Sequence, residues 1–410
     1  MQNFSYKARD AAGKQVAGVM EADSMAAVVN SLRGSNLFII EVKPVKSLWG
    51  SFAPPTLASI KENLQPKVRS KDLAVFCRQF STMIEAGVPL LASLEILKAQ
   101  ANHPILKNTL QGMRSHLEDG DTLAEALRAY PKVFPPILVN MVEAGEVGGA
   151  LDRVMARLAV HFEKEHEIQE KVKSAMTYPL VVLVVALLAV IFLLAFVLPN
   201  FTQMLTNMGV PLPLPTMIVI GISGFFQRFW YFTPVFFGAM AVGLMRLSRT
   251  PRGRAWKDRT LLRLPIFGDV IRKMIVSRFT RTFGTLLKGG VPILQALEVV
   301  KRTVGNTTVM AGIEEAQAAI RDGRGMAEPL AACNVFPPMV IQMISVGEET
   351  GTIDNLLEKI SVFYDEEVDQ VIGRLSSMIE PLLIVGLGGL VGFIILSILL
   401  PMFSVVGGIQ

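Results

Sequence analysis

The sequence predicts a mainly α-helical membrane protein with two homologous six-helix cytoplasmic bundles, three transmembrane helices and a small N-terminal α/β module. First, the stretch at 134–152, FPPILVNMVEAGEVGGALD, recurs about two hundred residues later at 336–354 as FPPMVIQMISVGEETGTID. Second, uncharged stretches alternate with charged, helix-patterned ones. Third, 51% of the residues are hydrophobic and 18% are charged, which is too apolar for a soluble chain and too charged for one lying wholly in lipid.

Residues 1–43 carry the pattern of a small α/β module. Side chains alternate as strands require, and Asp23 or Ser24 can cap a helix that Gly34 can end. Residues 44–69 lose this periodicity and hold four prolines, so we expect an extended linker. No apolar core of a signal peptide comes first, so the chain is expected to begin in the cytoplasm. The expected strands are 4–8, 16–22 and 37–42, and the expected helix is 25–33.

Residues 70–177 are expected to form the first bundle, because apolar residues recur there at spacings of three and four. Thr122 and Glu125 form the pattern of a capping box, in which each side chain bonds the other's free backbone N–H. Gly325 replaces the threonine in the second copy, so we expect a weaker helix start there. The six helices are expected from Ser70 to Gly87, from Pro89 to about 101, over 104–117, from Thr122, after Pro135-Pro136 to Gly145, and after Gly148-Gly149 toward the membrane.

Residues 250–377 repeat this pattern and are expected to form the second bundle. Gly290-Val291-Pro292 matches Gly87-Val88-Pro89, where the glycine stops a helix and the fixed φ of proline opens the next. Glycine and glutamate recur at each following junction between helices. The junction residues that we single out are Gly145, Glu146 and Gly149 in the first copy, and Gly347, Glu348 and Gly351 in the second.

Three apolar stretches are expected to cross a membrane. Residues 180–198 and 382–400 contain no charge and are long enough for a helix to span about 30 Å of hydrocarbon. The third span is expected at 229–247, because a cluster of arginines and lysines marks a return to the cytoplasm immediately afterward. The segment 199–228, which carries no charge up to residue 227, is then expected to be an external loop, and 401–410 an external tail.

The sequence contains no convincing catalytic or cofactor-binding motif. His166-Glu167 begins like a zinc-protease helix, but residue 170 is glutamate where the second histidine must stand. A phosphate-binding loop ending in Gly-Lys-Ser/Thr is also missing, so we expect no enzyme activity and no cofactor. The net charge of +5 is better explained by orientation of a membrane helix than by nucleic-acid binding. The spans 180–198 and 382–400 contain no charged residue, which argues against a transporter.

Carboxylates beside the glycine-rich junctions leave two interpretations open. Glu146 with Asp152, and Glu348 with Asp354, can accept N–H bonds from the start of the next helix or bind a divalent ion. Capping is favoured, because two carboxylates are too few for a calcium site, and we expect no metal. Glu380-Pro381 lies where the last span begins, so Glu380 is either a partner contact or simply hydrated.

These paired motifs identify a resemblance to a known family. The opening FSYKARDAAGKQVAGVMEA, the paired EAGVPLLASLE and KGGVPILQALE, and the paired VEAGEVGGALD and VGEETGTID resemble the type II secretion F family of inner-membrane platform proteins. That family includes the platforms of type IV pilus assembly. The resemblance covers almost all of the chain. It implies paired helical cytoplasmic domains, three spans, and a scaffold in the bacterial inner membrane with a periplasmic C-terminus.

The resemblance also implies partners. They are a cytoplasmic hexameric assembly or retraction ATPase, pilin or pseudopilin transmembrane helices, other inner-membrane alignment components, the lipid bilayer and further copies of the chain. We expect a non-enzymatic scaffold that passes movement from the ATPase to pilins through the long helix from 151 to 175, interrupted before the span at Tyr178-Pro179. The alternative is a membrane receptor or signalling adaptor. The motifs do not separate pilus assembly from secretion.

Overall fold

The computed structural model describes residues 2–9, 15–22, 38–44, 68–201, 213–228, 250–264 and 267–407, with 238, 240, 242–243 and 245–248 between them. The chain divides into two compact units, Met1–Pro66 and Lys67–Gln410. The expected helix at 25–33, most of the linker and most of the predicted span at 229–247 lie outside the described residues.

The first unit contains a three-stranded antiparallel sheet in the order β2-β1-β3. Its strands are β1 (Gln2–Arg9), β2 (Gln15–Ala22) and β3 (Phe38–Pro44), which lie at the three places where alternation predicts them. β1 pairs with both neighbours, and its register against β3 shifts at Lys7/Ala8.

The second unit begins with a bundle of six helices. Ser70 starts the first helix as predicted, and Thr122 with Glu125 forms the predicted capping box, with both hydrogen bonds made. The predicted end of the fifth helix at Gly145 is wrong, because this helix runs through Gly145 and ends at Val147. The helices are α3 (Ser70–Glu85), α4 (Leu90–Gln100), α5 (Pro104–Glu118), α6 (Leu123–Arg128), α7 (Pro136–Val147) and α8, which starts at Leu151.

A second bundle repeats these six helices, preceded by the basic helix α12 (Pro251–Arg263). The N-cap residue of α16 is Met326 rather than Gly325, and its side chain makes no capping bond. The capping box of the first copy is thus missing here, and the weaker helix start stays a prediction. The repeated helices are α13 (Phe267–Lys288), α14 (Ile293–Val304), α15 (Thr307–Arg321), α16 (Ala327–Ala332), α17 (Pro338–Thr350) and α18, which starts at Ile353.

Both bundles are built around the same three aromatic rings. Phe76 lies 5.7 Å from both Phe80 and Phe134 between ring centroids. Their counterparts repeat the arrangement, with Phe279 at 5.7 Å from Phe283 and 4.7 Å from Phe336. All six side chains are buried, and they belong to one continuous hydrophobic core that includes both bundles. Each buried ring stabilises the fold by about 1.5–3 kcal/mol.

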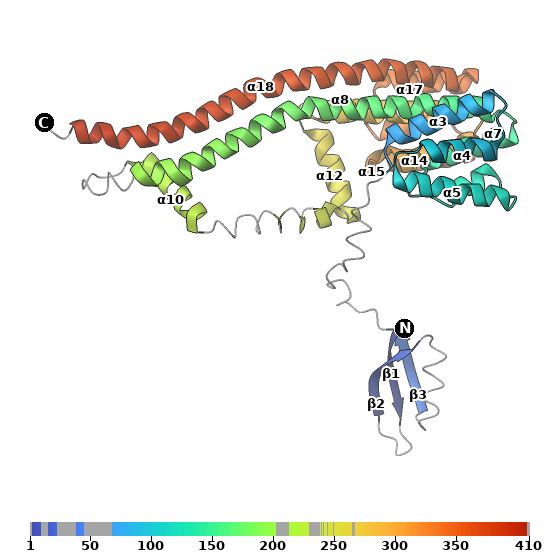
Figure 1. Cartoon of the computed structure of the whole chain (residues 1–410), viewed down its shortest axis with the longest axis horizontal. Coiled ribbons are helices and arrows are strands. Elements are labelled where there is room, and N and C mark those ends of the chain that lie inside the picture. Colours follow the sequence, from blue (N-terminus) through green and yellow to red (C-terminus); the bar gives the residue numbers. More distant parts are fainter. Residues whose placement is uncertain are drawn as a thin grey trace. The chain divides into compact units, whose positions relative to one another are not determined.

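The last helix of each bundle continues without a break into a predicted span. α8 (Leu151–Phe192) passes through Pro179, so the predicted interruption at Tyr178-Pro179 is wrong. It continues through the π-helical segment η2 (Leu193–Val197) to residue 201, and α18 (Ile353–Gly407) passes through Pro381. Among the described residues, these two helices are long and apolar enough to cross a membrane. They run side by side (Figure 1).

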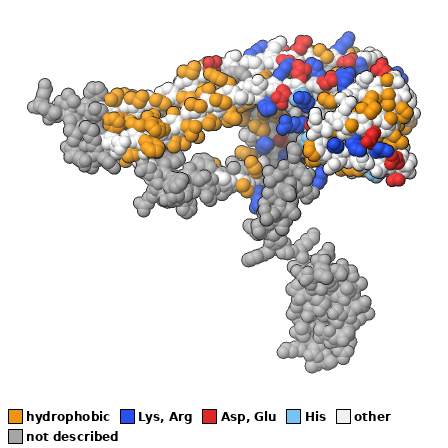
Figure 2. Space-filling view, in the orientation of Figure 1, with side chains coloured by type: hydrophobic (Ala, Val, Ile, Leu, Met, Phe, Trp, Pro, Cys, Tyr) orange, Lys and Arg blue, Asp and Glu red, His pale blue; other side chains and the backbone are white. Residues whose placement is uncertain are grey.

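The predicted external loop is partly helical. α10 (Leu214–Arg228) packs against η2 and α18. The Thr216 hydroxyl donates to the carbonyl of Ser397 at 2.6 Å, and the Ser223 hydroxyl donates to the carbonyl of Leu194 at 2.7 Å. Both acceptors lie within predicted spans, so α10 binds the ends of both long helices. Figure 2 shows hydrophobic side chains gathered over this part of α8 and α18, with charged side chains over the bundles.

Candidate functional site

The glycine-glutamate junctions join each bundle to its long helix. Gly145 lies inside α7, at a point where α8 approaches closely. A Cβ added there would lie 2.9 Å from a methyl group of Val154 in α8. At Gly347 in α17, an added Cβ would lie 2.8 Å from the Cα of Ile353 at the start of α18. A side chain at either position would push the long helix away, so glycine sets the close packing.

The glutamates of these junctions cap helices that precede them in the chain. Glu146 accepts the backbone N–H groups of Leu123 and Ala124, at 2.7 and 2.9 Å. Glu348 accepts those of Met326 and Ala327, at 2.7 and 3.3 Å. Free N–H groups and the helix dipole make a helix start favourable for a carboxylate. The prediction that these glutamates cap helices is confirmed, but the helix was predicted wrongly. Glu146 and Glu348 cap α6 and α16, which precede them, and not the long helices α8 and α18 that follow.

The two copies divide this capping differently. In the first bundle, the Thr122 side chain also caps α6. In the second bundle, Gly325 stands in that place, and a Cβ there would lie 3.1 Å from a carboxylate oxygen of Glu348. Among the described residues, Glu348 is thus the one side chain that accepts hydrogen bonds from the backbone N–H groups at the start of α16.

The remaining predicted junction residues shape turns. Gly149 and Gly351 have φ of +62° and +69°, and Gly87 and Gly290 have φ of +77° and +84°. These left-handed conformations favour glycine. Pro89 and Pro292 are the N-cap residues of α4 and α14, one position before the helix start that was predicted for them.

The carboxylates that were weighed as metal ligands do not form a metal cluster in the described part of the chain. Asp152 and Asp354 lie in the first turns of α8 and α18, where negative charge suits the helix dipole. Glu380 is exposed on α18, next to the equally exposed Pro381. Nothing in the described structure brings a second chemical group to Glu380.

The two bundles meet along α8, which lies against α13 and α18. The Arg157 guanidinium donates to the carbonyl of Lys288, and Lys171 pairs with Asp369, Nζ to Oδ2, at 2.5 Å. A cavity of about 510 Å³ opens at this contact. The charged residues that line it are Arg78, Arg157, Lys164, Arg281, Lys288, Glu358 and Asp365.

His161 of α8 is buried at this contact between the bundles. Burial, followed by the positive charges of Arg281 and Arg278, lowers its pKa from 6.5 to about 3. The imidazole is therefore neutral near pH 7. Its Nδ1 atom is buried and has no hydrogen-bond partner among the described residues.

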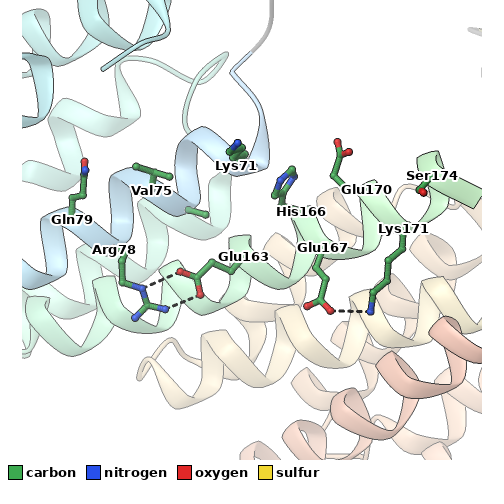
Figure 3. Close-up of a pocket in the computed structure, with 11 residues that line it drawn as sticks. Lys71, Val75, Arg78, Gln79, Glu163, His166, Glu167, Glu170, Lys171 and Ser174 are labelled. Atoms are coloured by element: carbon green, nitrogen blue, oxygen red, sulfur yellow. Dashed lines mark hydrogen bonds and ion pairs between the residues drawn. The ribbon is translucent and has the colours of Figure 1, made fainter. Parts of the chain in front are cut away.

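Sequence reasoning missed a repeated ion pair between the first and last helices of each bundle. Arg78 pairs with Glu163, Nη2 to Oε2, at 2.7 Å, and Arg281 pairs with Asp365. The first pair lines a groove of about 650 Å³ between α3 and α8 (Figure 3). These four residues are related by the same repeat as the glycine motifs, so comparison of the two copies could have found them.

Comparison with known proteins agrees with the duplicated fold. Residues 76–199 and 279–401 match the family described as type II secretion system (T2SS), protein F, and residues 1–43 match the N-terminal domain of that protein. The chain is 42% identical over 407 residues to the type IV pilus assembly protein PilC of Myxococcus xanthus, covering 99% of this chain and 96% of the relative. It is 40% identical over 413 residues to PilC of Thermus thermophilus, covering 99% of both chains.

A relative named for secretion aligns over the same length. The chain is 32% identical over 410 residues to the type II secretion system protein F of Xanthomonas campestris, covering 100% of both chains. The two matches to the main family pattern cover more than half of the chain, and each one spans a bundle and its apolar helix. The resemblance that the paired motifs indicate is confirmed: this chain belongs to the type II secretion system protein F family.

Proposed function

We propose that this protein is a platform of the bacterial inner membrane that couples a cytoplasmic hexameric ATPase to the assembly of pilins or pseudopilins. In this proposal both bundles lie in the cytoplasm, three helices span the membrane, and the C-terminus is periplasmic. The platform is a non-enzymatic scaffold: the ATPase supplies the energy and the platform transmits the movement.

The observation that carries the proposal is the continuity of α8 and α18. Each helix belongs to a bundle core at one end and to an apolar stretch at the other, with no loop between them. An unbroken helix resists bending far better than a loop does, so a push on a bundle is transmitted along the helix axis. The Lys171–Asp369 pair joins the two helices before the apolar stretches begin.

Sequence identity favours pilus assembly over secretion. Two relatives named for type IV pilus assembly are 42% and 40% identical to this chain, against 32% and 30% for two relatives named type II secretion system protein F. All four alignments cover at least 96% of both chains. We therefore propose that the helices that this platform handles are type IV pilins.

Glycine insertions test the coupling. Three glycines inserted after Ala175 or after Ser377 interrupt α8 or α18 between bundle and apolar stretch, and should abolish piliation while the protein still accumulates in the membrane. The matched control is the same insertion after Asp119, in the exposed turn between α5 and α6. Normal piliation with both helix insertions would contradict rigid coupling.

Copurification tests the partners. A tagged full-length chain that restores piliation to a deletion strain should bring down an ATPase and a pilin from solubilised membranes. A deletion strain that assembles pili normally but shows altered gene expression would instead identify a receptor or signalling adaptor.

A further inference from the structure

The two bundles use corresponding surfaces differently. We call the surface formed by Ser277, Arg281, Asp365 and Asp369 the covered groove, because α8 of the first bundle lies over it. Its counterpart in the first bundle, formed by Ala74, Arg78, Glu163 and Glu167, is the open groove of Figure 3.

Exposure of the repeated ion pair shows the difference. In the covered groove, the side chains of Arg281 and Asp365 are 10% and 19% exposed. In the open groove, those of Arg78 and Glu163 are 47% and 45% exposed. The same pair of charges, made by the same pair of helices, is thus sealed in one copy and faces solvent in the other.

The face of α8 that seals the covered groove also has a counterpart. His161 is the buried residue of that face, at 5% exposure. The repeat places Phe363 of α18 at the same position, and Phe363 is 46% exposed. The second bundle therefore exposes the counterpart of the α8 face, and the first bundle exposes the counterpart of the covered groove. These two exposed surfaces correspond to the two sides of the contact that joins the bundles within the chain.

Between the internal contact and the two exposed surfaces, the residue on the helix face and the residue in the groove both change from polar to apolar. In the internal contact, His161 lies near the charged Arg278. At the corresponding positions, Phe363 replaces the histidine and Val75 replaces the arginine. Val75 is 47% exposed in the open groove. A polar pair is therefore replaced by two exposed apolar side chains, which gain free energy by covering each other.

We propose that the open groove binds α18 of a second copy of this chain, with Phe363 of that copy packed on Val75 beside the Arg78–Glu163 pair. The contact repeats between chains the one that joins the two bundles within a chain. It is heterologous, because each chain offers its open groove to one neighbour and its Phe363 face to another.

The geometry of the internal contact suits a membrane assembly. α8 and α18 run in the same direction, and Lys171 pairs with Asp369, whose counterpart Glu167 lies one helical turn from Lys171. The two copies are therefore related mainly by rotation about an axis along the helices, with a shift of about one turn, or about 5 Å. A rotation about such an axis keeps all apolar helices in one bilayer, whereas repeating the shift would carry successive chains out of it. The contact between chains therefore closes into a ring only if it reverses the shift made within each chain.

Disulfide trapping in membranes tests the pairing. Cells that produce one full-length chain with Val75→Cys and another with Phe363→Cys should form a cross-linked dimer on oxidation, whereas each variant alone should not. Both chains also carry Cys77→Ala and Cys333→Ala, because the native chain has these two free cysteines. The two introduced cysteines then lie on different chains, so no cross-link within a chain contributes. Absence of the mixed dimer, or a dimer with Phe363→Cys alone, would overturn the proposal, since the latter indicates a symmetric contact.

A second measurement does not depend on cross-linking. Phe363→Glu should lower the native mass of the detergent-solubilised full-length protein to that of a monomer, because a buried unpaired carboxylate is costly. The matched control is Ile96→Glu, an exposed apolar residue of α4 outside both faces. An unchanged mass for Phe363→Glu would contradict the proposal. Neither measurement involves pilus assembly, so the result is independent of the proposed function.

Discussion

Lys171 of α8 and Asp369 of α18 form an ion pair of 2.5 Å, Nζ to Oδ2, that joins the two long helices beside the bundles. Glu167 holds the same ammonium group at 2.8 Å, one turn earlier on α8. The hydrogen bond to Asp369, followed by that to Glu167, raises the pKa of Lys171, so the ammonium group stays charged near pH 7. The pair connects two residues about two hundred positions apart in the chain.

The Lys171–Asp369 pair should fix the register of the helices more than it stabilises the fold. Lys171→Glu places three carboxylates together and should reduce piliation, and Asp369→Lys in the same chain should restore it. Both side chains are 39% exposed, so we expect a coupling energy below about 1 kcal/mol in a double-mutant cycle. Failure of the reversed pair to restore piliation would show that the pair has no such role.

Loss of a junction carboxylate should destabilise the second bundle more than the first. Glu348→Ala leaves two N–H groups of α16 unpaired and should cost about 1–3 kcal/mol. Glu146→Ala also leaves two N–H groups of α6 unpaired, but it should cost less, because Thr122 still bonds a third N–H group, that of Glu125, and keeps this helix start capped. Thermal unfolding of the full-length protein in detergent measures both changes, at roughly 2–4 °C per kcal/mol. Equal shifts for the two variants would contradict the difference in capping.

Close packing at Gly347 should make it intolerant of a methyl group. Gly347→Ala brings a Cβ within 2.8 Å of the Ile353 backbone and should lower the midpoint of thermal unfolding. The matched control is Gly373→Ala in α18, where an added Cβ meets nothing within 4 Å. That change should stabilise the helix by about 0.5–1 kcal/mol. We expect the midpoint of thermal unfolding to fall for Gly347→Ala and to rise for Gly373→Ala. Shifts of the two midpoints in the same direction would refute the packing argument.

Burial of neutral His161 should make stability fall in mild acid. Its pKa is lowered from 6.5 to about 3, so below pH 6.5 the unfolded chain binds a proton that the folded chain excludes. Proton binding to the unfolded chain favours unfolding, so the free energy of unfolding is highest above pH 6.5 and decreases as the pH falls toward 3. His161→Phe, which copies residue 363 of the second bundle, should show a smaller decrease in unfolding temperature between pH 7 and 5 than the parent protein.

The helix boundaries could be predicted because they depend on nearby residues. Gly87 and Gly290 end helices through their own left-handed φ, and Thr122 caps a helix through a residue three positions away. The role of Glu146 could not be predicted in the same way. Its hydrogen bonds reach 22 and 23 residues back to α6, and that distance closes only when α6 packs on α7.

The sequence by itself determined the duplication, most of the breaks between helices and the apolar stretches at 180–198 and 382–400, because periodicity, glycine and proline act within a few residues. Only the tertiary structure decided which surfaces of the two copies are used. Copies with matching helices can pack in several ways, and the packing that buries His161 against Arg281 leaves Phe363 and the Arg78–Glu163 pair exposed. That choice depends on the free energy of contacts between residues far apart in the chain.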